Sequence, residues 1–179
     1  VCSSDLFMSS QLVYLNGEYL PLNEAKVSVL DRGFIFGDGV YEVIPVYAGH
    51  CFELEAHLNR LQYSLDGVRM KNPMTLQQWQ TMIEELVNRN GGGDQSLYLQ
   101  VTRGVAPRDH VFPTGVEPTA FAMSNPLQAV AEKYKQNGIK AITLPDIRWA
   151  NCNIKAITLL PNSLLKQQAL EAGAQEALL

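Results

Sequence analysis

Three glycines, two aspartates and an arginine lie close together near the start of the chain. Asp31–Gly39 reads DRGFIFGDG, and glycine at this density indicates close backbone approach or positive φ angles. A phosphate-binding loop needs GxGxxG spacing or a Gly-Lys-Ser/Thr ending, and the segment has neither. We therefore predict a turn between two extended segments here, and we find little support for nucleotide binding.

A second pattern that could do chemistry is Arg108-Asp109-His110, in the polar, proline-containing stretch 104–118. Donors at i and i+2 on a loop can together bind a carboxylate. A solvated surface pair is the commoner arrangement for such residues. Loops of this length are usually functional or mobile, so the stretch is a candidate binding loop.

Two further cations, Arg60 and Lys155, are ambiguous when the residue types are taken alone. A lysine is almost never fully buried, so an isolated Lys155 would be read as a surface side chain. Arg60 would be read as a helix-surface arginine that pairs with Glu53 or Asp66. Neither residue assigns an activity without its context.

The composition excludes several classes of protein. The 179 residues carry 14 Lys and Arg against 18 Asp and Glu, a formal charge of −4, which argues against nucleic-acid binding. No apolar run approaches the roughly 20 residues of a membrane span. The three cysteines show no CxxC spacing, which favours a reducing compartment and hence the cytoplasm. The three histidines lack HxxxH and HExxH spacing, so we expect no dedicated metal site.

The elements that must position these residues follow from periodicity and turn residues. For the first part of the chain we predict a hairpin at 12–20 around Asn16-Gly17, an extended stretch at 27–30, a strand at 40–47, and helices at 53–68 and from 76 to 90, the second with a Thr75/Gln78 capping box. For the rest we predict strands at 97–102 and 119–123, a helix at 127–136, a strand at 139–144, a helix at 162–172, and a strand from 175. The apolar residues Ile157, Leu159 and Leu160 are compatible with a half-buried strand beyond Lys155.

Four motifs in one register carry a resemblance to a known family. They read DRGFIFGDGVYEV at 31–43, HLNRL at 57–61, RDH at 108–110 and RWANCNIK at 148–155. In this order they resemble the class IV aminotransferases, pyridoxal phosphate enzymes of fold type IV, and most of all the members that act on D-amino acids. The resemblance extends from about residue 12 to residue 179.

The resemblance implies an α+β fold, with an N-terminal α/β sandwich-like small domain followed by the beginning of a second, larger class IV aminotransferase domain. We expect a non-native leader at 1–7, the small domain at 8–123, a linker and connecting helix at 124–137, and the start of the cofactor-binding domain at 138–179.

The resemblance also implies a role for each candidate residue. Lys155 would be the lysine that forms a Schiff base with pyridoxal 5'-phosphate, and Arg60 would bind the cofactor phosphate. Tyr41, Arg108 and His110 would bind the substrate carboxylate. A guanidinium suits both kinds of anion because its fork donates paired hydrogen bonds.

Three neighbouring residues have roles that are less defined. His57 is expected to be a packed histidine that at most supports Arg60. Glu42 would orient Tyr41 or lie on the rim of the site. Arg148 would aid the carboxylate-binding network or form a structural salt bridge.

The implied substrates are a D-amino acid such as D-alanine and a 2-oxo acid such as pyruvate or 2-oxoglutarate. In the family the loop of Arg108 and His110 comes from the neighbouring subunit, so the resemblance implies a homodimer with composite sites. A branched-chain L-amino acid transaminase and an aminodeoxychorismate lyase are the alternatives, and Arg108 and His110 argue against both.

The family's acidic partner of the pyridine nitrogen and the remaining groups around the phosphate would lie beyond Leu179. Glu171 and Glu176 are too close to Lys155 in sequence to replace that acid. We therefore expect a C-terminally truncated chain that is inactive by itself, and an inert partial domain remains a further alternative.

Overall fold

A computed structural model describes residues 11–179, so the leader expected at 1–7 lies outside the described residues. The chain divides into two compact units. One contains the residues up to 127 together with 154–157, and the other contains residues 128–153 and 158–179. The segment that carries Lys155 therefore belongs to the first unit.

The first unit is built on an antiparallel six-stranded sheet in the order β2-β1-β6-β5-β3-β4. Its strands are β1 (Leu12–Leu15), β2 (Glu18–Pro21), β3 (Gly39–Tyr47), β4 (His50–Cys51), β5 (Gln95–Thr102) and β6 (Thr119–Pro126). The predicted hairpin is confirmed, and Asn16 and Gly17 turn it with φ angles of 49° and 103°. The short strand β4 was not predicted.

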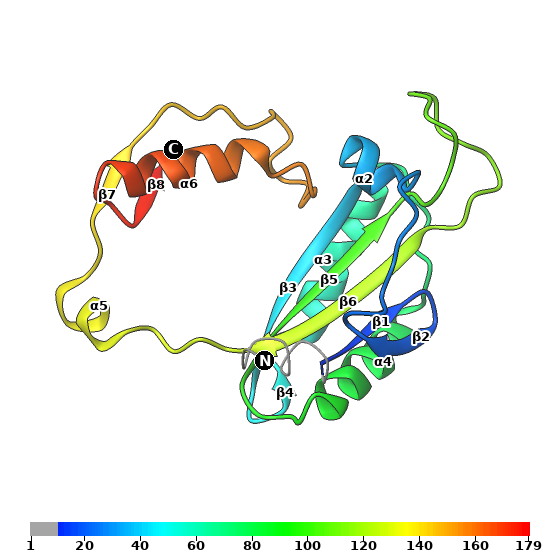
Figure 1. Ribbon diagram of the computed structural model, residues 1–179, viewed down its shortest axis with the longest axis horizontal. Coiled ribbons are helices and arrows are strands. Elements are labelled where there is room, and N and C mark those ends of the chain that lie inside the picture. The colour runs from blue at the N-terminus through cyan, green and yellow to red at the C-terminus, as the bar shows by residue number, and fades with distance from the viewer. Residues whose placement is uncertain (1–10) are drawn as a thin grey trace. The chain divides into compact units, whose positions relative to one another are not determined.

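Two helices, α3 (Leu54–Gly67) and α4 (Leu76–Arg89), pack on one face of this sheet (Figure 1). Alternate residues of β3 and β5 meet the leucines of α3 and the apolar side of α4 in a single core. The predicted capping box is present, because Thr75 and Gln78 each accept the other's backbone N–H. Trp79, in the first turn of α4, is almost completely buried. This two-layer arrangement confirms the α+β fold class.

The glycine-rich segment holds a short helix, α2 (Arg32–Phe36), where we predicted only a turn. Asp31 accepts the Gly33 N–H at the start of the helix, and Gly37 ends it with a φ of 65°. Five residues are too few for periodicity to reveal a helix. The aspartate and glycine that read as turn residues are its two caps.

Four other local predictions were wrong or misplaced. Residues 27–30 form no strand, because they pair with none of the six strands, and the 127–136 helix is confined to α5 (Glu132–Asn137). Strand β6 runs to Pro126 because it pairs with β5 throughout, so residues 124–126 are part of the sheet rather than a linker. Beyond Lys155 the chain makes an isolated bridge instead of a strand.

The second unit is a small parallel unit. Its strands β7 (Ala141–Thr143) and β8 (Glu176–Leu178) pair in parallel and are joined through α6 (Leu160–Glu171). The predicted strands near 139–144 and 175–179 and the helix ending before Gly173 are confirmed. Within residues 11–179, no helix is long and apolar enough to cross a membrane.

Candidate active site

The backbone of Lys155 is fixed between a strand and a helix of the first unit. Its carbonyl accepts the Tyr41 N–H at 3.0 Å, and its own N–H donates to Ser64 Oγ at 3.2 Å. Two residues further on, the Ile157 N–H donates to the Gly39 carbonyl at 3.1 Å. The short segment thus occupies the outer edge of β3 at the end that β4 does not reach.

The Lys155 side chain lies on an aromatic surface. Its Nζ is 3.9 Å from the centre of the Tyr41 ring, and Tyr41 stacks on Tyr98 with ring centres 5.7 Å apart. Burial, together with the neighbouring Tyr41, raises the pKa of Tyr98 to about 12. Among the described residues no carboxylate reaches Nζ. The amine is half-buried and has no acidic partner among the described residues, so no ion pair has to be broken before it reacts as a nucleophile or base.

Glu42, the next residue along β3, binds two cationic or donor side chains of α3. Arg60 donates from Nε and Nη2 to the two carboxylate oxygens at 2.7 and 2.6 Å, and His57 Nδ1 lies 2.9 Å from Oε2. A carboxylate can only accept, so Nδ1 carries the hydrogen of that bond. Glu42 is fully buried, whereas the Arg60 side chain is half exposed. The hydrogen bond to Glu42 raises the pKa of Arg60 further above its usual value.

These contacts correct two of the alternatives raised by the sequence. Arg60 pairs with Glu42, not with Glu53 or Asp66, because α3 turns the guanidinium toward the edge of β3. Glu42 is not a rim carboxylate, because it occupies the inward phase of the strand with Val40 and Ile44.

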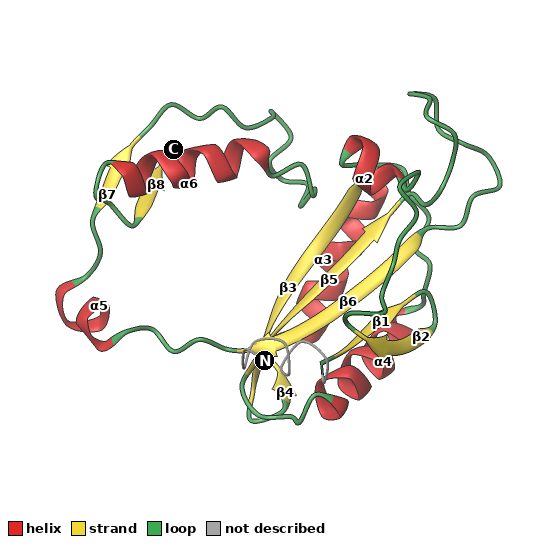
Figure 2. Cartoon of the chain, in the orientation of Figure 1, coloured by secondary structure: helices red, strands yellow, loops and turns green. Residues whose placement is uncertain are grey.

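Arg108 and His110, in the loop between β5 and β6, both contact the ring of Phe36. The His110 ring is centred 5.3 Å from that of Phe36, and the Arg108 guanidinium lies 5.3 Å from the same ring centre. Both side chains are exposed, and no contact joins them to Tyr41 or Lys155 within residues 11–179. Figure 2 shows this loop as the long connection between β5 and β6.

A buried charge cluster anchors the same loop. Asp38 accepts from Arg32 at 2.8 Å and from two nitrogens of Arg103 at 2.8 and 3.0 Å. Burial would raise the pKa of Asp38, but the hydrogen bonds from Arg103 and Arg32 outweigh it and hold the pKa below its usual value. Arg32 also donates to the Asp109 carbonyl, and the Arg103 guanidinium stacks on Phe112. We did not predict this cluster from the sequence.

In the second unit, Arg148 makes the salt bridge that was one of its two expected arrangements. Its guanidinium binds both carboxylate oxygens of Asp146 at 3.0 and 2.8 Å. These hydrogen bonds lower the pKa of Asp146 to about 2. Glu176 pairs with Lys166, and Glu171 accepts from Gln167.

The structure therefore brings some predicted residues together and leaves others apart. Tyr41 and Lys155 are in contact, and Arg60 is joined to the strand through Glu42. Ser64 was missed, although it lies three residues beyond Leu61 on the inward side of α3 and its burial was readable from that spacing. None of the residues 11–179 forms a group of three metal-binding side chains.

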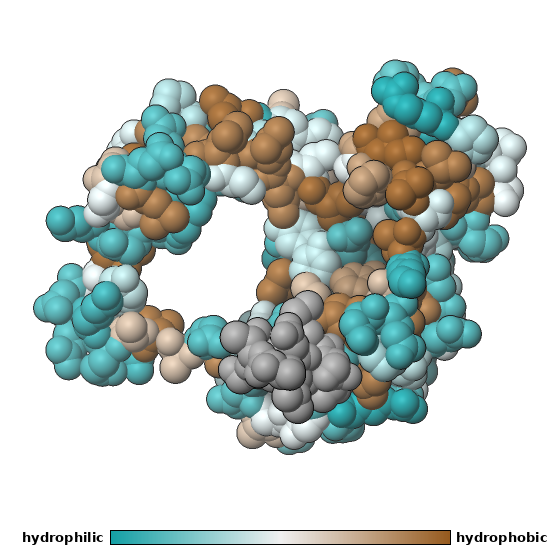
Figure 3. All heavy atoms as spheres, viewed as in Figure 1, coloured by the Kyte–Doolittle hydropathy of each residue, from teal (hydrophilic) through white to brown (hydrophobic). Residues whose placement is uncertain are grey.

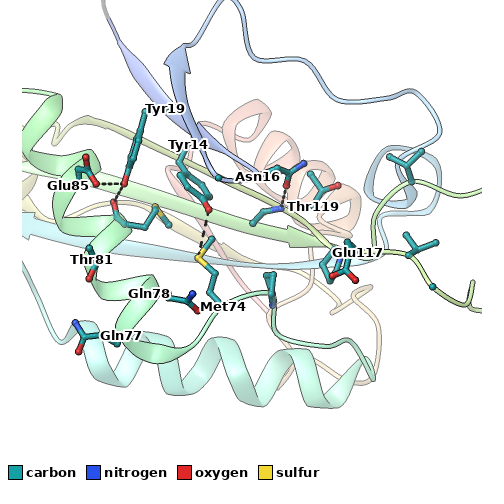
Figure 4. A pocket seen from close by; sticks show the side chains of 18 residues that line it. Tyr14, Asn16, Tyr19, Met74, Gln77, Gln78, Thr81, Glu85, Glu117 and Thr119 are labelled. Carbon is teal, nitrogen blue, oxygen red and sulfur yellow. Dashed lines mark hydrogen bonds between the residues drawn. The ribbon is translucent and has the colours of Figure 1, made fainter.

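A cavity of about 980 Å³ lies elsewhere in the first unit. Figure 4 shows its walls, formed by the β1–β2 hairpin, α4 and the end of the long loop, with Tyr19 bonded to Glu85 and Tyr14 to Met74. None of the five predicted site residues lines it. We therefore place the candidate site at the outer edge of β3.

Comparison with known proteins identifies the class to which this fold and lysine segment belong. The family described as Amino-transferase class IV matches residues 39–179, which is most of the chain. The chain belongs to the class IV aminotransferases.

Particular relatives are similar over nearly the whole chain. The D-alanine aminotransferases of Bacillus licheniformis and Staphylococcus haemolyticus are 44% and 40% identical over 93% of this chain. The solved structure of a hypothetical aminotransferase from Mycobacterium tuberculosis, in its PLP-bound form, matches 93% of the chain with a TM-score of 0.77 and 25% identity. The chain spans 59% of the length of the two D-alanine aminotransferases and 60% of that of the solved protein.

Proposed function

We propose that the whole protein is a pyridoxal phosphate-dependent transaminase that exchanges the amino group of a D-amino acid, D-alanine or a close analogue, with a 2-oxo acid. The observation that carries the proposal is Lys155. Its backbone is hydrogen bonded on both sides, and its amine rests on Tyr41 without an acidic partner. The 44% identity to a D-alanine aminotransferase supports the choice of substrate.

The residues at the edge of β3 fit the cofactor chemically. Lys155 supplies an uncommitted amine that can bond to an aldehyde. Arg60 uses Nε and Nη2 on Glu42, so Nη1 is left for a phosphate. The negative charge of Glu42 is offset by the guanidinium, so it does not repel an anion bound there. When bound, the cofactor supplies the ring that takes up negative charge as the substrate Cα loses its proton.

The chain's own side chains would then have distinct tasks. In the first half of the exchange the Lys155 amine would accept the proton from Cα of the amino acid. In the second half it would donate a proton to the corresponding carbon of the 2-oxo acid as that acid is aminated. The Tyr41 ring keeps that amine in place. Arg60 would bind the phosphate, and Glu42 with His57 would hold the guanidinium at a fixed angle. Arg108 and His110 would bind the substrate carboxylate.

The site would be completed across a homodimer. Arg108 and His110 lie at Phe36, away from Tyr41 and Lys155 in their own chain. Figure 3 shows apolar residues gathered over α2 and the adjoining loop, and the most exposed are Val29, Phe34 and Val111, each at least 70% exposed. An apolar surface beside the carboxylate-binding pair fits contact with a second copy. On the cysteine argument alone, we place the dimer in the cytoplasm.

Two amino donors separate this proposal from its alternatives. In the whole protein, with 2-oxoglutarate as acceptor, D-alanine should yield pyruvate and D-glutamate, whereas L-leucine should react much more slowly. Lys155→Ala should lower the rate by orders of magnitude. Lys166→Ala removes an exposed lysine that is paired with Glu176 and should leave the rate unchanged. Faster reaction of L-leucine would favour a branched-chain enzyme and refute the D-specific proposal.

Complementation tests the composite site. Arg108→Ala should cost about 2–5 kcal/mol of substrate binding, mainly as a raised KM. If the loop acts across the dimer, mixing inactive Lys155→Ala with Arg108→Ala creates one intact site in each mixed dimer. Random reassortment should then restore roughly a quarter of the wild-type activity. No recovery in a mixture shown to exchange subunits would place the loop in the site of its own chain.

A further inference from the structure

Helix α3 carries two adjacent stripes of residues, which meet at the buried Ser64. Leu58, Leu61 and Leu65 face the core. The second stripe contains His57, Arg60, Ser64 and Gly67, which are spaced by three, four and three residues and so lie along one side of the helix. This second stripe meets the outer edge of β3. His57 and Arg60 are already accounted for by Glu42, but the proposed reaction gives Ser64 and Gly67 no task.

Ser64 is a fully buried serine whose hydroxyl has one hydrogen-bond partner within residues 11–179, a backbone N–H. Among the described residues, its hydroxyl oxygen accepts one hydrogen bond, from the Lys155 N–H at 3.2 Å. A buried hydroxyl is costly unless it is hydrogen bonded. An alanine would fill nearly the same space without that cost, so the hydroxyl is accounted for by the one bond that it makes.

Gly67 allows the same segment to lie close to the helix. A β-carbon at this position would come within 2.8 Å of Ile154 Cδ1, which is closer than carbon atoms can pack. Ile154 is itself packed against the core, directly before Lys155. A β-carbon at position 67 would therefore require the Ile154 side chain, which precedes the lysine, to move from its place against the core.

We propose that Ser64 and Gly67 are positioning residues that hold the backbone of Lys155 against α3. This inference rests on the proposed role of Lys155 as the reacting amine. Tyr41 holds the lysine carbonyl from β3, and Ser64 holds the amide from α3. Because both peptide groups are held, the Cα of Lys155 has a fixed position, and from that position the side-chain amine reaches the Tyr41 ring. One helix thus supports both the phosphate-binding guanidinium and the reacting amine.

Hydrogen exchange tests whether Ser64 holds the Lys155 amide, and it does not depend on catalytic turnover. In Ser64→Ala the Lys155 amide should exchange about tenfold faster, because its hydrogen-bond acceptor is gone, while the amide of Leu97 in the core should not change. Ser163→Ala, an exposed helix serine bonded to its own helix, is the matched control and should leave both amides unchanged. An unchanged Lys155 amide in Ser64→Ala, or equal acceleration at Leu97, would overturn the proposal.

A second experiment measures how fast the Lys155 amine reacts with an aldehyde. Pyridoxal, which lacks the phosphate and so does not depend on Arg60, can be fixed to lysines by borohydride, and the modified peptide can be quantified. Modification at Lys155 should be about fivefold slower in both Ser64→Ala and Gly67→Ala. Ile154→Ala removes the clashing atoms and should restore the rate in Gly67→Ala.

The two possible failures are distinguishable. If the wild-type protein is modified by pyridoxal phosphate at other lysines and not at Lys155, the proposed function fails while the exchange result still stands. If Lys155 is modified normally but neither variant slows it, the positioning role fails and the proposed function survives.

Discussion

Replacing Asp38 with asparagine should strongly destabilise the first unit. Asp38 is the shared acceptor of Arg32 and Arg103, whose side chains are only 4% and 9% exposed. Removing one partner of a buried ion pair costs about 3–5 kcal/mol. Both guanidiniums keep backbone carbonyl partners in the variant, so we expect the lower end, about 3 kcal/mol. This corresponds to a fall of roughly 10 °C in the melting temperature.

The effect should depend on pH in a definite direction. The folded-state pKa of Asp38 lies below its ordinary value, so its stabilising contribution is present above about pH 4, the unfolded pKa, and is lost as the pH falls through the folded pKa. The difference in stability between wild type and Asp38→Asn should therefore be constant near neutrality and shrink on acidification below about pH 4.

Urea unfolding can isolate this effect in the first unit. Trp79 is buried in α4 and reports on that unit, and a Trp149→Phe background removes the exposed tryptophan of the other. Glu85→Gln is a control because Glu85 accepts two bonds from Arg89 in the same unit but at the surface, and its unfolding midpoint should hardly move. Equal midpoints for wild type and Asp38→Asn at pH 7 would refute the reasoning.

Four further substitutions test other parts of the structure. Thr75→Ala removes a helix cap and should cost about 1 kcal/mol, measured by the same urea unfolding. Gly104→Ala should cost more than about 2 kcal/mol, since its φ is 95° and a β-carbon would strike a backbone carbonyl, whereas Gly115→Ala, with open space around it, should cost only about 1–2 kcal/mol. Glu42→Gln should weaken binding of pyridoxal phosphate more than that of pyridoxal, measured by titration, because only the first uses the guanidinium that Glu42 holds; equal losses would remove Glu42 from phosphate binding.

The elements that the sequence predicted well are those whose signals are local and repeated. The Thr75/Gln78 box and the apolar stripe behind it specify α4 without reference to any other part of the chain. Asn16-Gly17 specifies its hairpin in the same way, because few other residues tolerate two successive positive φ angles. The 27–30 stretch contains β-branched residues as the true strands do, but it has no pairing partner. A strand needs such a partner, so composition alone did not specify one here.

The candidate site was only partly predictable because its contacts join distant residues. Motifs indicated Tyr41 and Lys155, but the 3.9 Å between amine and ring depends on how an irregular segment docks against β3. The partner of Arg60 was misjudged because the acids considered were on or beside its own helix, whereas its partner Glu42 lies on β3. Glu42 could have been found from its place in the alternating pattern of the strand, since a carboxylate in an inward position needs a cationic or donor partner.

The two buried charge clusters have a common place in the fold. Asp38 and Glu42 lie on either side of Gly39–Tyr41, the three residues whose backbone holds the Lys155 segment. Apolar side chains would often stabilise such buried positions at least as well as ion pairs do, so stability alone does not account for the charges. One cluster fixes α2 and the loop of Arg108, and the other fixes the guanidinium of Arg60. Both charge clusters therefore lie where β3 must hold several side chains at fixed angles.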